Sequence, residues 1–196
     1  PVMNCKWLPV QTVREDRPQG RLLLKLLRNH ISAICMHTNL DAAQGGVNDL
    51  LAKALHLADP VPLHVSGIGR LGTLEEPMAL PEFIRLVSRA LGCGGVRYAG
   101  ADRPVSRVAV GGGSCGDFEA DAIAAGCDTF VTSDLGYHQF LDAAGKGINL
   151  VDAGHFPTED LICGEIVSYL SARFPGLAVA KSASHREVIQ YYIEGE

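Results

Sequence analysis

The fold of this chain is decided by the stretch Gly147-Ile148-Asn149-Leu150-Val151-Asp152-Ala153-Gly154-His155-Phe156-Pro157-Thr158-Glu159. Its first five residues form a short apolar run that predicts a buried strand, and a helical spacing of apolar residues follows at Leu161, Ile162, Ile166 and Leu170. His155 and Glu159 therefore lie where a strand ends and a helix begins. If the helical turn starts at His155, their four-residue spacing places both side chains on one face. An imidazole and a carboxylate that converge in this way provide half of a divalent-metal site.

The helix has an alternative start three residues later. In that case Thr158 is the N-cap, and Glu159 and Asp160 are first-turn acids that the helix dipole favours. From these residues alone, the metal site and the simple helix start have about equal weight.

The rest of the chain continues the alternation of strand and helix. Helices are predicted over residues 20–28, 47–55, 81–91, 117–125, 137–144 and 158–174. Strands are predicted over residues 31–36, 105–110, 129–132, 177–181 and 188–193, with a loop or irregular strand over 59–72. Strands that alternate with helices are typical of α/β proteins, so we expect that fold class.

Composition narrows the class of protein further. The 196 residues suit one or two domains, and a net charge of −5 without any run of basic residues argues against a nucleic-acid surface. The six cysteines form no CxxC pair and predict reduced thiols of a cytoplasmic protein. No apolar run approaches the roughly 18 residues of a membrane span, and no signal peptide is evident, so we expect no membrane association.

A second polar cluster, His37-Thr38-Asn39-Leu40-Asp41, follows the predicted strand 31–36. Ligands bind at the carboxyl ends of strands in open α/β sheets, so His37 and Asp41 are candidates for a cleft. The alternative is that Asp41 caps the next helix and His37 is a hydrogen-bonded core residue. Together with His155 and Glu159, the cluster supplies the mixed nitrogen and oxygen ligands that suit zinc, iron or manganese.

A glycine-rich loop, Gly111-Gly112-Gly113-Ser114-Cys115-Gly116, has the form of the dinucleotide fingerprint GxGxxG. Acidic residues at 117, 119 and 121 crowd the following helix start and would repel a phosphate there. A tight turn that lets the backbone approach a cleft is the better interpretation. Cys115 in this loop has no adjacent histidine to form a nucleophile pair.

Asp134 and His138 follow another predicted strand, residues 129–132, and can face the same cleft. A solvated helix start explains them equally well. If they do face the cleft, His138 is a candidate for proton transfer, as is His37.

Five blocks of the chain, in order, resemble the dinuclear metal-centre hexameric proteins, the Nif-three-like family often named GTP cyclohydrolase I type 2 homologues. The blocks are HTNLD with GGVN, GIGRLG, the strand and GGS loop, TSDLGYH and DAGHFPTE, at residues 37–48, 67–72, 108–114, 132–138 and 152–159. The resemblance covers about residues 1–196. It implies one Nif-three-like α/β domain of two related, interleaved lobes, with mixed sheets flanked by helices.

The resemblance also implies a site and an assembly. Family members bind two divalent cations in a cleft between the lobes, which implies metal roles for Asp41, His155 and Glu159, with Glu159 as the first candidate for a bridging ligand. His37 would line the same cleft. The metals would be zinc, iron or manganese, and the implied assembly is a toroidal homohexamer.

The chain departs from the family pattern in two ways. Members carry a His-His pair just before a proline, and Pro1 here corresponds to that proline, so we expect an N-terminal segment with two further ligands outside this sequence. In addition, Cys115 and Ser133 replace glycines of the family blocks.

Two functions from different classes follow. One is a metal-dependent hydrolase that acts on a phosphate-containing or nucleotide-like substrate, with His37 or His138 moving the proton. The alternative is a non-catalytic metal-binding scaffold or regulatory protein that works through partners. A nucleotide-binding module that rests on the glycine loop alone is a third and weaker hypothesis.

Overall fold

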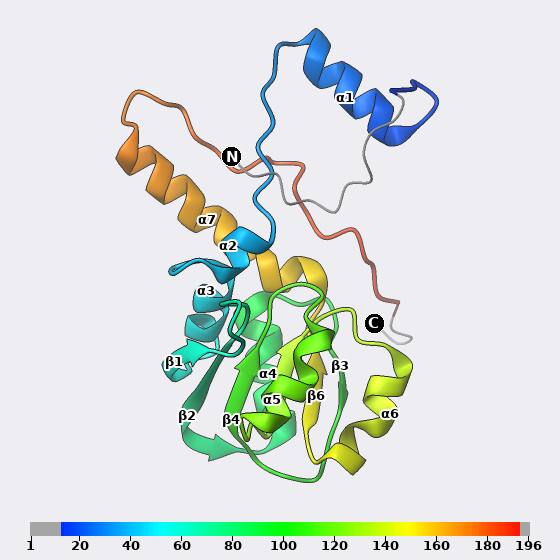
Figure 1. The fold of residues 1–196 in the computed structure, drawn as a ribbon, viewed down its shortest axis with the longest axis vertical. Coiled ribbons are helices and arrows are strands. Elements are labelled where there is room, and N and C mark those ends of the chain that lie inside the picture. Colours follow the sequence, from blue (N-terminus) through cyan, green and yellow to red (C-terminus); the bar gives the residue numbers. More distant parts are fainter. Residues whose placement is uncertain (1–12, 193–196) are drawn as a thin grey trace. The chain divides into compact units, whose positions relative to one another are not determined.

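The computed structural model describes residues 13–192, and the chain divides into two units, residues 1–40 and 41–196 (Figure 1). The first unit contains helix α1 (Pro18–Arg28), which begins with a proline at a position where the missing N–H costs nothing. An ion pair of 2.6 Å joins Arg28 to Glu15, ahead of the helix. The helix confirms the prediction for residues 20–28.

The predicted buried strand 31–36 is wrong. These residues are exposed and belong to no helix or strand. An apolar run becomes a strand only where a neighbouring strand pairs with its backbone, and among residues 13–192 none pairs with this one. A short helix, α2 (Thr38–Ala42), follows it.

The second unit is built on a six-stranded mixed sheet with the order β1-β2-β4-β5-β6-β3. Three central strands are parallel: β4 (Val105–Val110), β5 (Thr129–Thr132) and β6 (Asn149–Asp152). The outer strands are antiparallel to their neighbours: β1 (Ala58–Pro62), β2 (Arg70–Met78) and β3 (Arg97–Ala99). The carboxyl ends of the parallel strands therefore meet at one edge of the sheet.

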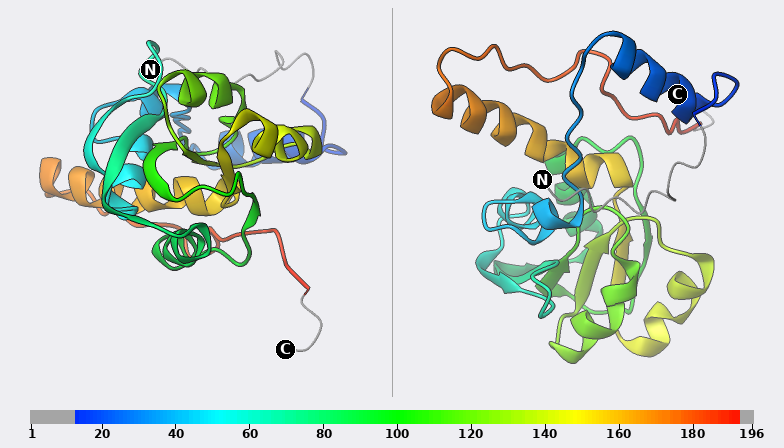
Figure 2. Two further views of the ribbon diagram at one scale, coloured as in Figure 1. Left: turned by 90° about the horizontal axis from the view of Figure 1, so that it is seen from below. Right: turned by 45° about the horizontal axis from the view of Figure 1, so that its top comes forward.

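Alternation along the strands separates two cores. Val108, Val131 and Val151 face one side, where they pack with buried residues of α3 (Val47–Ala54) and α4 (Leu80–Leu91). Ala109, Phe130 and Leu150 face the other side, where they pack with α5 (Glu119–Ala124) and α6 (Tyr137–Lys146). Helices thus cover both faces of the sheet (Figure 2), as expected for an α/β protein.

Helix α7 (His155–Arg173) begins at His155 itself, three residues before the start predicted at Thr158. Gly154 precedes it with φ of 88°, a left-handed conformation that favours glycine. The hydroxyl of Thr158 donates to the carbonyls of Gly154 and His155 in the first turn. The earlier start is the alternative that places His155 and Glu159 on one helical face.

The stretch 59–72, predicted as a loop or irregular strand, contains most of β1, whose pairing with β2 shifts register between Ala58 and Val61, and the start of β2. Arg70 anchors this stretch through an ion pair with Asp49 and donates to the carbonyls of Gly67 and Gly69. The short strand β3 has no alternating pattern long enough to predict it. The final strands 177–181 and 188–193 are wrong as far as residue 192, because this tail pairs with neither edge strand of the sheet.

Within residues 13–192, no helix has both the length and the apolar character required to cross a membrane.

The ring of Phe83 on α4 is fully buried against the sheet, so a substitution at this position tests how the core contributes to stability. We expect Phe83→Ala to lower the free energy of unfolding by about 3–5 kcal/mol, since it leaves a cavity that the rigid sheet cannot fill. Phe174→Ala is a matched control, because that ring is 48% exposed, and it should cost less than about 1 kcal/mol. Urea unfolding at equilibrium measures both values, and similar losses for the two variants would contradict this account of the core.

Candidate metal site

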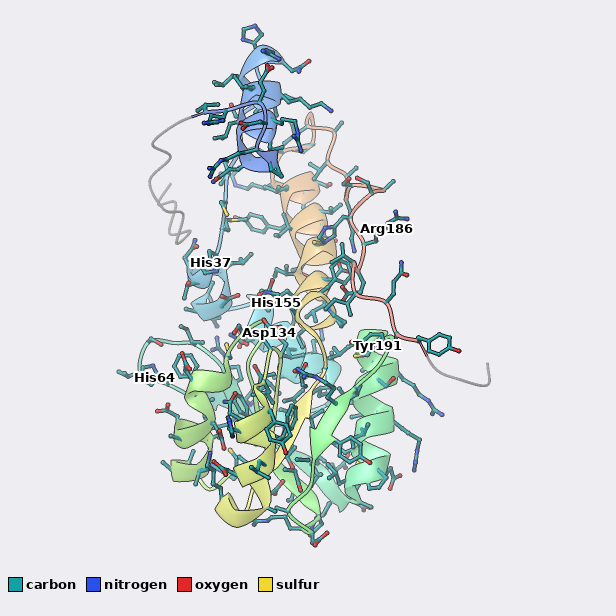
Figure 3. The ribbon with its side chains drawn as sticks, turned by 90° about the vertical axis from the view of Figure 1, so that its right-hand side faces the viewer. His37, His64, Asp134, His155, Arg186 and Tyr191 are labelled. Carbon is teal, nitrogen blue, oxygen red and sulfur yellow. The ribbon has the colours of Figure 1, made fainter. Side chains whose placement is uncertain are left out.

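Two loops at the carboxyl edge of the parallel strands bring Asp134 and His155 together. Asp134 follows β5, and His155 follows β6 as the first residue of α7. Their side chains lie next to each other above the sheet (Figure 3). Asp134 adopts φ of 58°, which is uncommon for a residue other than glycine and tends to occur where a functional geometry is enforced.

The imidazole of His155 has a carboxylate at each nitrogen. Nδ1 lies 2.7 Å from Oδ2 of Asp134, and Nε2 lies 3.3 Å from Oε1 of Glu159. A hydrogen bond at Nδ1 sets the orientation of the ring and directs the lone pair of Nε2 outward, which is the arrangement usual for a metal-bound histidine.

These carboxylates also set the charge of the imidazole in the metal-free protein. Glu159 raises the pKa of His155 to about 9 from its ordinary value of 6.5, and Asp134 adds to the effect while partial burial opposes it. The ring is therefore protonated at neutral pH, and a cation at Nε2 would have to displace that proton.

Gly113 leaves the space that the carboxylate of Glu159 occupies. A Cβ at this position would lie 2.3 Å from Oε1 of Glu159 and 3.2 Å from Nε2 of His155, so any side chain would displace the pair. The φ of Gly113 is 64°, which independently favours glycine.

The glycine-rich loop is fixed by side chains rather than left open for a phosphate. Gly112 donates its N–H to Oδ1 of Asn48 at 2.8 Å, and Gly113 donates to Oγ1 of Thr158 at 3.0 Å. Both acceptors are fully buried. Two amides of the kind that would bind a pyrophosphate are thus already engaged, which weakens the nucleotide-binding hypothesis and favours the tight-turn interpretation.

Asn48 also ties Asp41 to this loop. Its Nδ2 donates to the backbone carbonyl of Asp41 at 3.0 Å, while its Oδ1 accepts from Gly112. One buried amide therefore connects the start of the second unit with the loop that faces Glu159. The sequence analysis did not single out Asn48, although it lies in the block GGVN.

The buried thiol of Cys115 experiences the negative charges of both Asp41 and Glu159. Burial raises the pKa of Cys115 to about 12, and the negative charges of Asp41 and Glu159 contribute next. Both carboxylates thus lie within electrostatic reach of a single thiol. Cys115 donates its S–H to the carbonyl of Gly112, and as a buried neutral thiol it is a packing residue rather than a nucleophile.

Asp152 at the end of β6 is a second positioning residue that the sequence analysis missed. It is buried, pairs with Arg97 on β3, and accepts from Leu135 N at 3.1 Å and from Gly154 N at 3.0 Å. Its carboxylate thereby holds both loops that carry Asp134 and His155. A buried acid at a strand end is visible in the sequence, but its partners are not.

These residues fit a divalent cation. Metal ligands each about 2.0–2.2 Å from one ion lie roughly 3–4 Å apart, and the 3.3 Å between His155 Nε2 and Glu159 Oε1 has this spacing. Imidazole nitrogen and carboxylate oxygen suit zinc, iron and manganese.

Each of the two proposed proton carriers contacts a neighbouring residue in the chain. His138 on α6 is exposed, and its ring lies against Tyr137 with centroids 5.6 Å apart. His37 belongs to the first unit, where its Nδ1 lies 2.9 Å from the hydroxyl of Thr38. Their catalytic roles stay predictions.

A cavity of about 410 Å3 adjoins His155 and Glu159. It lies along α7 and is lined on the other side by residues 185–189 of the chain that follows this helix. Its wall is largely apolar, with one cation at Arg186, and consists of Phe156, Asp160, Ile162, Cys163, His185, Arg186, Glu187, Val188 and Ile189. The candidate metal ligands therefore have space beside them for a small molecule.

Comparisons with known proteins agree with the geometry. The family model Duf34/NIF3 (NGG1p interacting factor 3) matches residues 5–187. The chain is 36% identical over 155 residues to a GTP cyclohydrolase 1 type 2 homolog of Clostridium perfringens, covering 76% of this chain and 59% of that protein. It is 32% identical over 182 residues to the Protein NIF3 homolog of Schizosaccharomyces pombe, covering 81% and 63%.

The fold is also shared with solved structures. A Bacillus cereus protein related to NIF3 superposes with a TM-score of 0.84 at 21% identity, covering 94% of this chain and 80% of that one. This similarity concerns the fold alone. The chain spans about three fifths of the length of the curated relatives named above. A family model that matches nearly the whole chain, residues 5–187, shows that this chain belongs to the Duf34/NIF3 family.

Proposed function

We propose that this protein binds two divalent cations per full-length chain and is a metal-dependent hydrolase, with Asp41, His155 and Glu159 as metal ligands. One observation carries the proposal. The ring of His155 is held at Nδ1 by Asp134, while its Nε2 lies 3.3 Å from the carboxylate of Glu159. A structural histidine needs one partner, whereas this arrangement prepares the second nitrogen for a cation.

The surrounding residues support a preorganised site. Gly113 provides the space for Glu159, and Asn48 and Asp152 hold the loops from which the ligands project. Ligands held in place by buried hydrogen bonds lose little entropy when they bind an ion. Metal identity is proposed only as zinc, iron or manganese, which all accept this ligand set.

If Asp41, His155 and Glu159 held two cations, these would supply Lewis-acid chemistry, which means a lower pKa for a bound water and polarisation of the bond to be broken. The residues of the chain then have separate tasks. Asp134 keeps the imidazole of His155 in one orientation. Arg186 would attract a negatively charged group of a substrate to the cavity, and Phe156 and Ile162 would offer an apolar surface to its remainder. We therefore propose a phosphate-containing or nucleotide-like substrate.

The name GTP cyclohydrolase 1 type 2 homolog belongs to the relatives, and no contact in the described residues selects a purine. The non-catalytic scaffold stays the competing proposal for the function. Assembly into a homohexamer is a separate proposal that fits either function. A screen of phosphoesters separates the two functions. Metal-dependent turnover that Glu159→Ala abolishes supports the hydrolase, and bound metal without any turnover supports the scaffold.

Metal content tests the ligand set directly. We expect elemental mass spectrometry of the full gene product to show about two divalent ions per chain fewer in Glu159→Ala than in the wild type, because that carboxylate is a proposed ligand. The matched control is Glu165→Ala, which removes an exposed carboxylate from the same helix and should retain the metal. Equal metal content in the two variants would contradict the assignment of Glu159.

Asp134→Asn tests whether the carboxylate at Nδ1 of His155 is needed for metal binding. Asparagine adopts the left-handed backbone of this position easily, so the fold should persist. The loss of the carboxylate at Nδ1 should weaken metal affinity by about 10–100-fold. Asp142→Asn, at an exposed position on α6, is the control and should leave affinity unchanged. Competition with a chelator measures both affinities, and an unchanged value for Asp134→Asn would rule out this role.

The raised pKa of His155 predicts a pH dependence for the metal-free protein. Its folded pKa, about 9, is above the unfolded value of 6.5. The protonated ring therefore contributes stability that is fully present below pH 6.5 and is lost as the pH rises through 9. Urea unfolding of chelator-treated protein should show this decline between these pH values. His155→Gln should flatten it and His138→Gln should preserve it. A decline unchanged in His155→Gln would assign it to another group.

A further inference from the structure

A second cluster of metal-ligating side chains lies further along α7, outside the site described above. Asp160 and Cys163 are three residues apart on this helix, a spacing that places them on one face. His185 reaches the same place from the chain that follows the helix. Oδ1 of Asp160 lies 3.0 Å from Nε2 of His185, and Sγ of Cys163 lies 3.7 Å from the same nitrogen. All three ligand atoms lie within 4.8 Å of one another.

We propose that Asp160, Cys163 and His185 form an additional cation site of zinc type. Ligands at the usual zinc distances, about 2.0–2.3 Å, span a tetrahedron whose edges are roughly 3.3–3.8 Å. The distances of 3.0 and 3.7 Å are close to these edges. A thiolate, an imidazole and a carboxylate are the donors that zinc combines in proteins. This site does not depend on the proposed hydrolase function.

His185 is held in position although it lies outside regular secondary structure. Its ring lies against that of Phe156, with centroids 4.9 Å apart. Further along, Tyr191 lies so close to Gly94 and Gly95 that a Cβ on either would approach its ring to 3.0 Å or less. The contact of His185 with Phe156 and the contact of Tyr191 with the glycines hold this segment along the second unit. Figure 3 shows its path from Arg186 to Tyr191.

Lys181 shows that a positive charge is favourable at this position. Its ammonium lies 2.5 and 2.6 Å from the two carboxylate oxygens of Asp160. In the metal-free protein, Lys181 and His185 both contact this carboxylate, and a divalent cation would take over that role. Lys181 therefore competes with the cation for the carboxylate of Asp160. Removing its charge should increase the affinity of the site for a cation, and this tests the proposal.

The same three residue types could instead form a nucleophilic triad, and the geometry disfavours this. In a triad, the thiol contacts one ring nitrogen and the carboxylate orients the ring through the other. Here Asp160 and Cys163 both approach Nε2 of His185. Convergence on one nitrogen is the arrangement expected when the three atoms surround a single ion.

Cobalt(II) provides the test, because it replaces zinc and absorbs in the near ultraviolet only when a thiolate binds it. The full-length protein is titrated with cobalt(II) under reducing conditions. We expect the thiolate-to-cobalt absorption in the wild type and its loss in Cys163→Ser. The matched control is Cys93→Ser, since Cys93 is also partly buried and bonds to the carbonyl of Ala153. That control should retain the absorption.

Two more variants complete the test. Lys181→Met should tighten cobalt binding by about two- to fivefold, the range expected for losing one competing ion pair at the surface. Glu159→Ala should keep the thiolate absorption, so failure of the proposed dinuclear site remains distinguishable from failure of this one. No thiolate absorption in the wild type, its survival in Cys163→Ser, or weaker binding in Lys181→Met would overturn the proposal.

Discussion

The carboxylate of Asp152 is the constraint on which the candidate site depends. It is buried at the end of β6, where it pairs with Arg97 and accepts N–H bonds from Leu135 and Gly154. These partners come from β3, from the loop after β5 and from the turn before α7. Burial of a carboxylate is costly unless such partners bond to it, so the three segments are held together by one group. Asp134 and His155 project from two of them and meet as a result.

A second constraint is steric and acts on the other side of the site. Gly112 and Gly113 bring the loop after β4 so close to α3 and α7 that a Cβ would lie 2.6 Å from Val47 and 2.3 Å from Glu159. The buried side chains of Asn48 and Thr158 satisfy the amides of this loop. Close packing and complete hydrogen bonding thus support the same geometry, which is what a preorganised ligand set requires.

Helix α7 presents two different sets of candidate ligands because of its periodicity. His155 and Glu159 share one face at a spacing of four, and Asp160 and Cys163 share a neighbouring face at a spacing of three. The first set has only nitrogen and oxygen donors, whereas the second includes a thiol. The two sets line one cavity. A cation at either set would therefore change the electrostatic potential at an anion bound in that cavity.

The sequence by itself determined the α/β class, most helices, the three parallel strands and the pairing of His155 with Glu159. These follow from periodicity and local spacing, which act over a few residues. It also indicated the Duf34/NIF3 family through blocks that keep their order. Only the tertiary structure decided that Asp134 is the partner of His155, that Asn48 and Asp152 hold the loops, and that His185 returns to Cys163. It also decided that residues 31–36 and the final tail are not strands. Each of these outcomes depends on contacts between segments distant in sequence, and a strand or a hydrogen-bonded carboxylate exists only where such a partner is present.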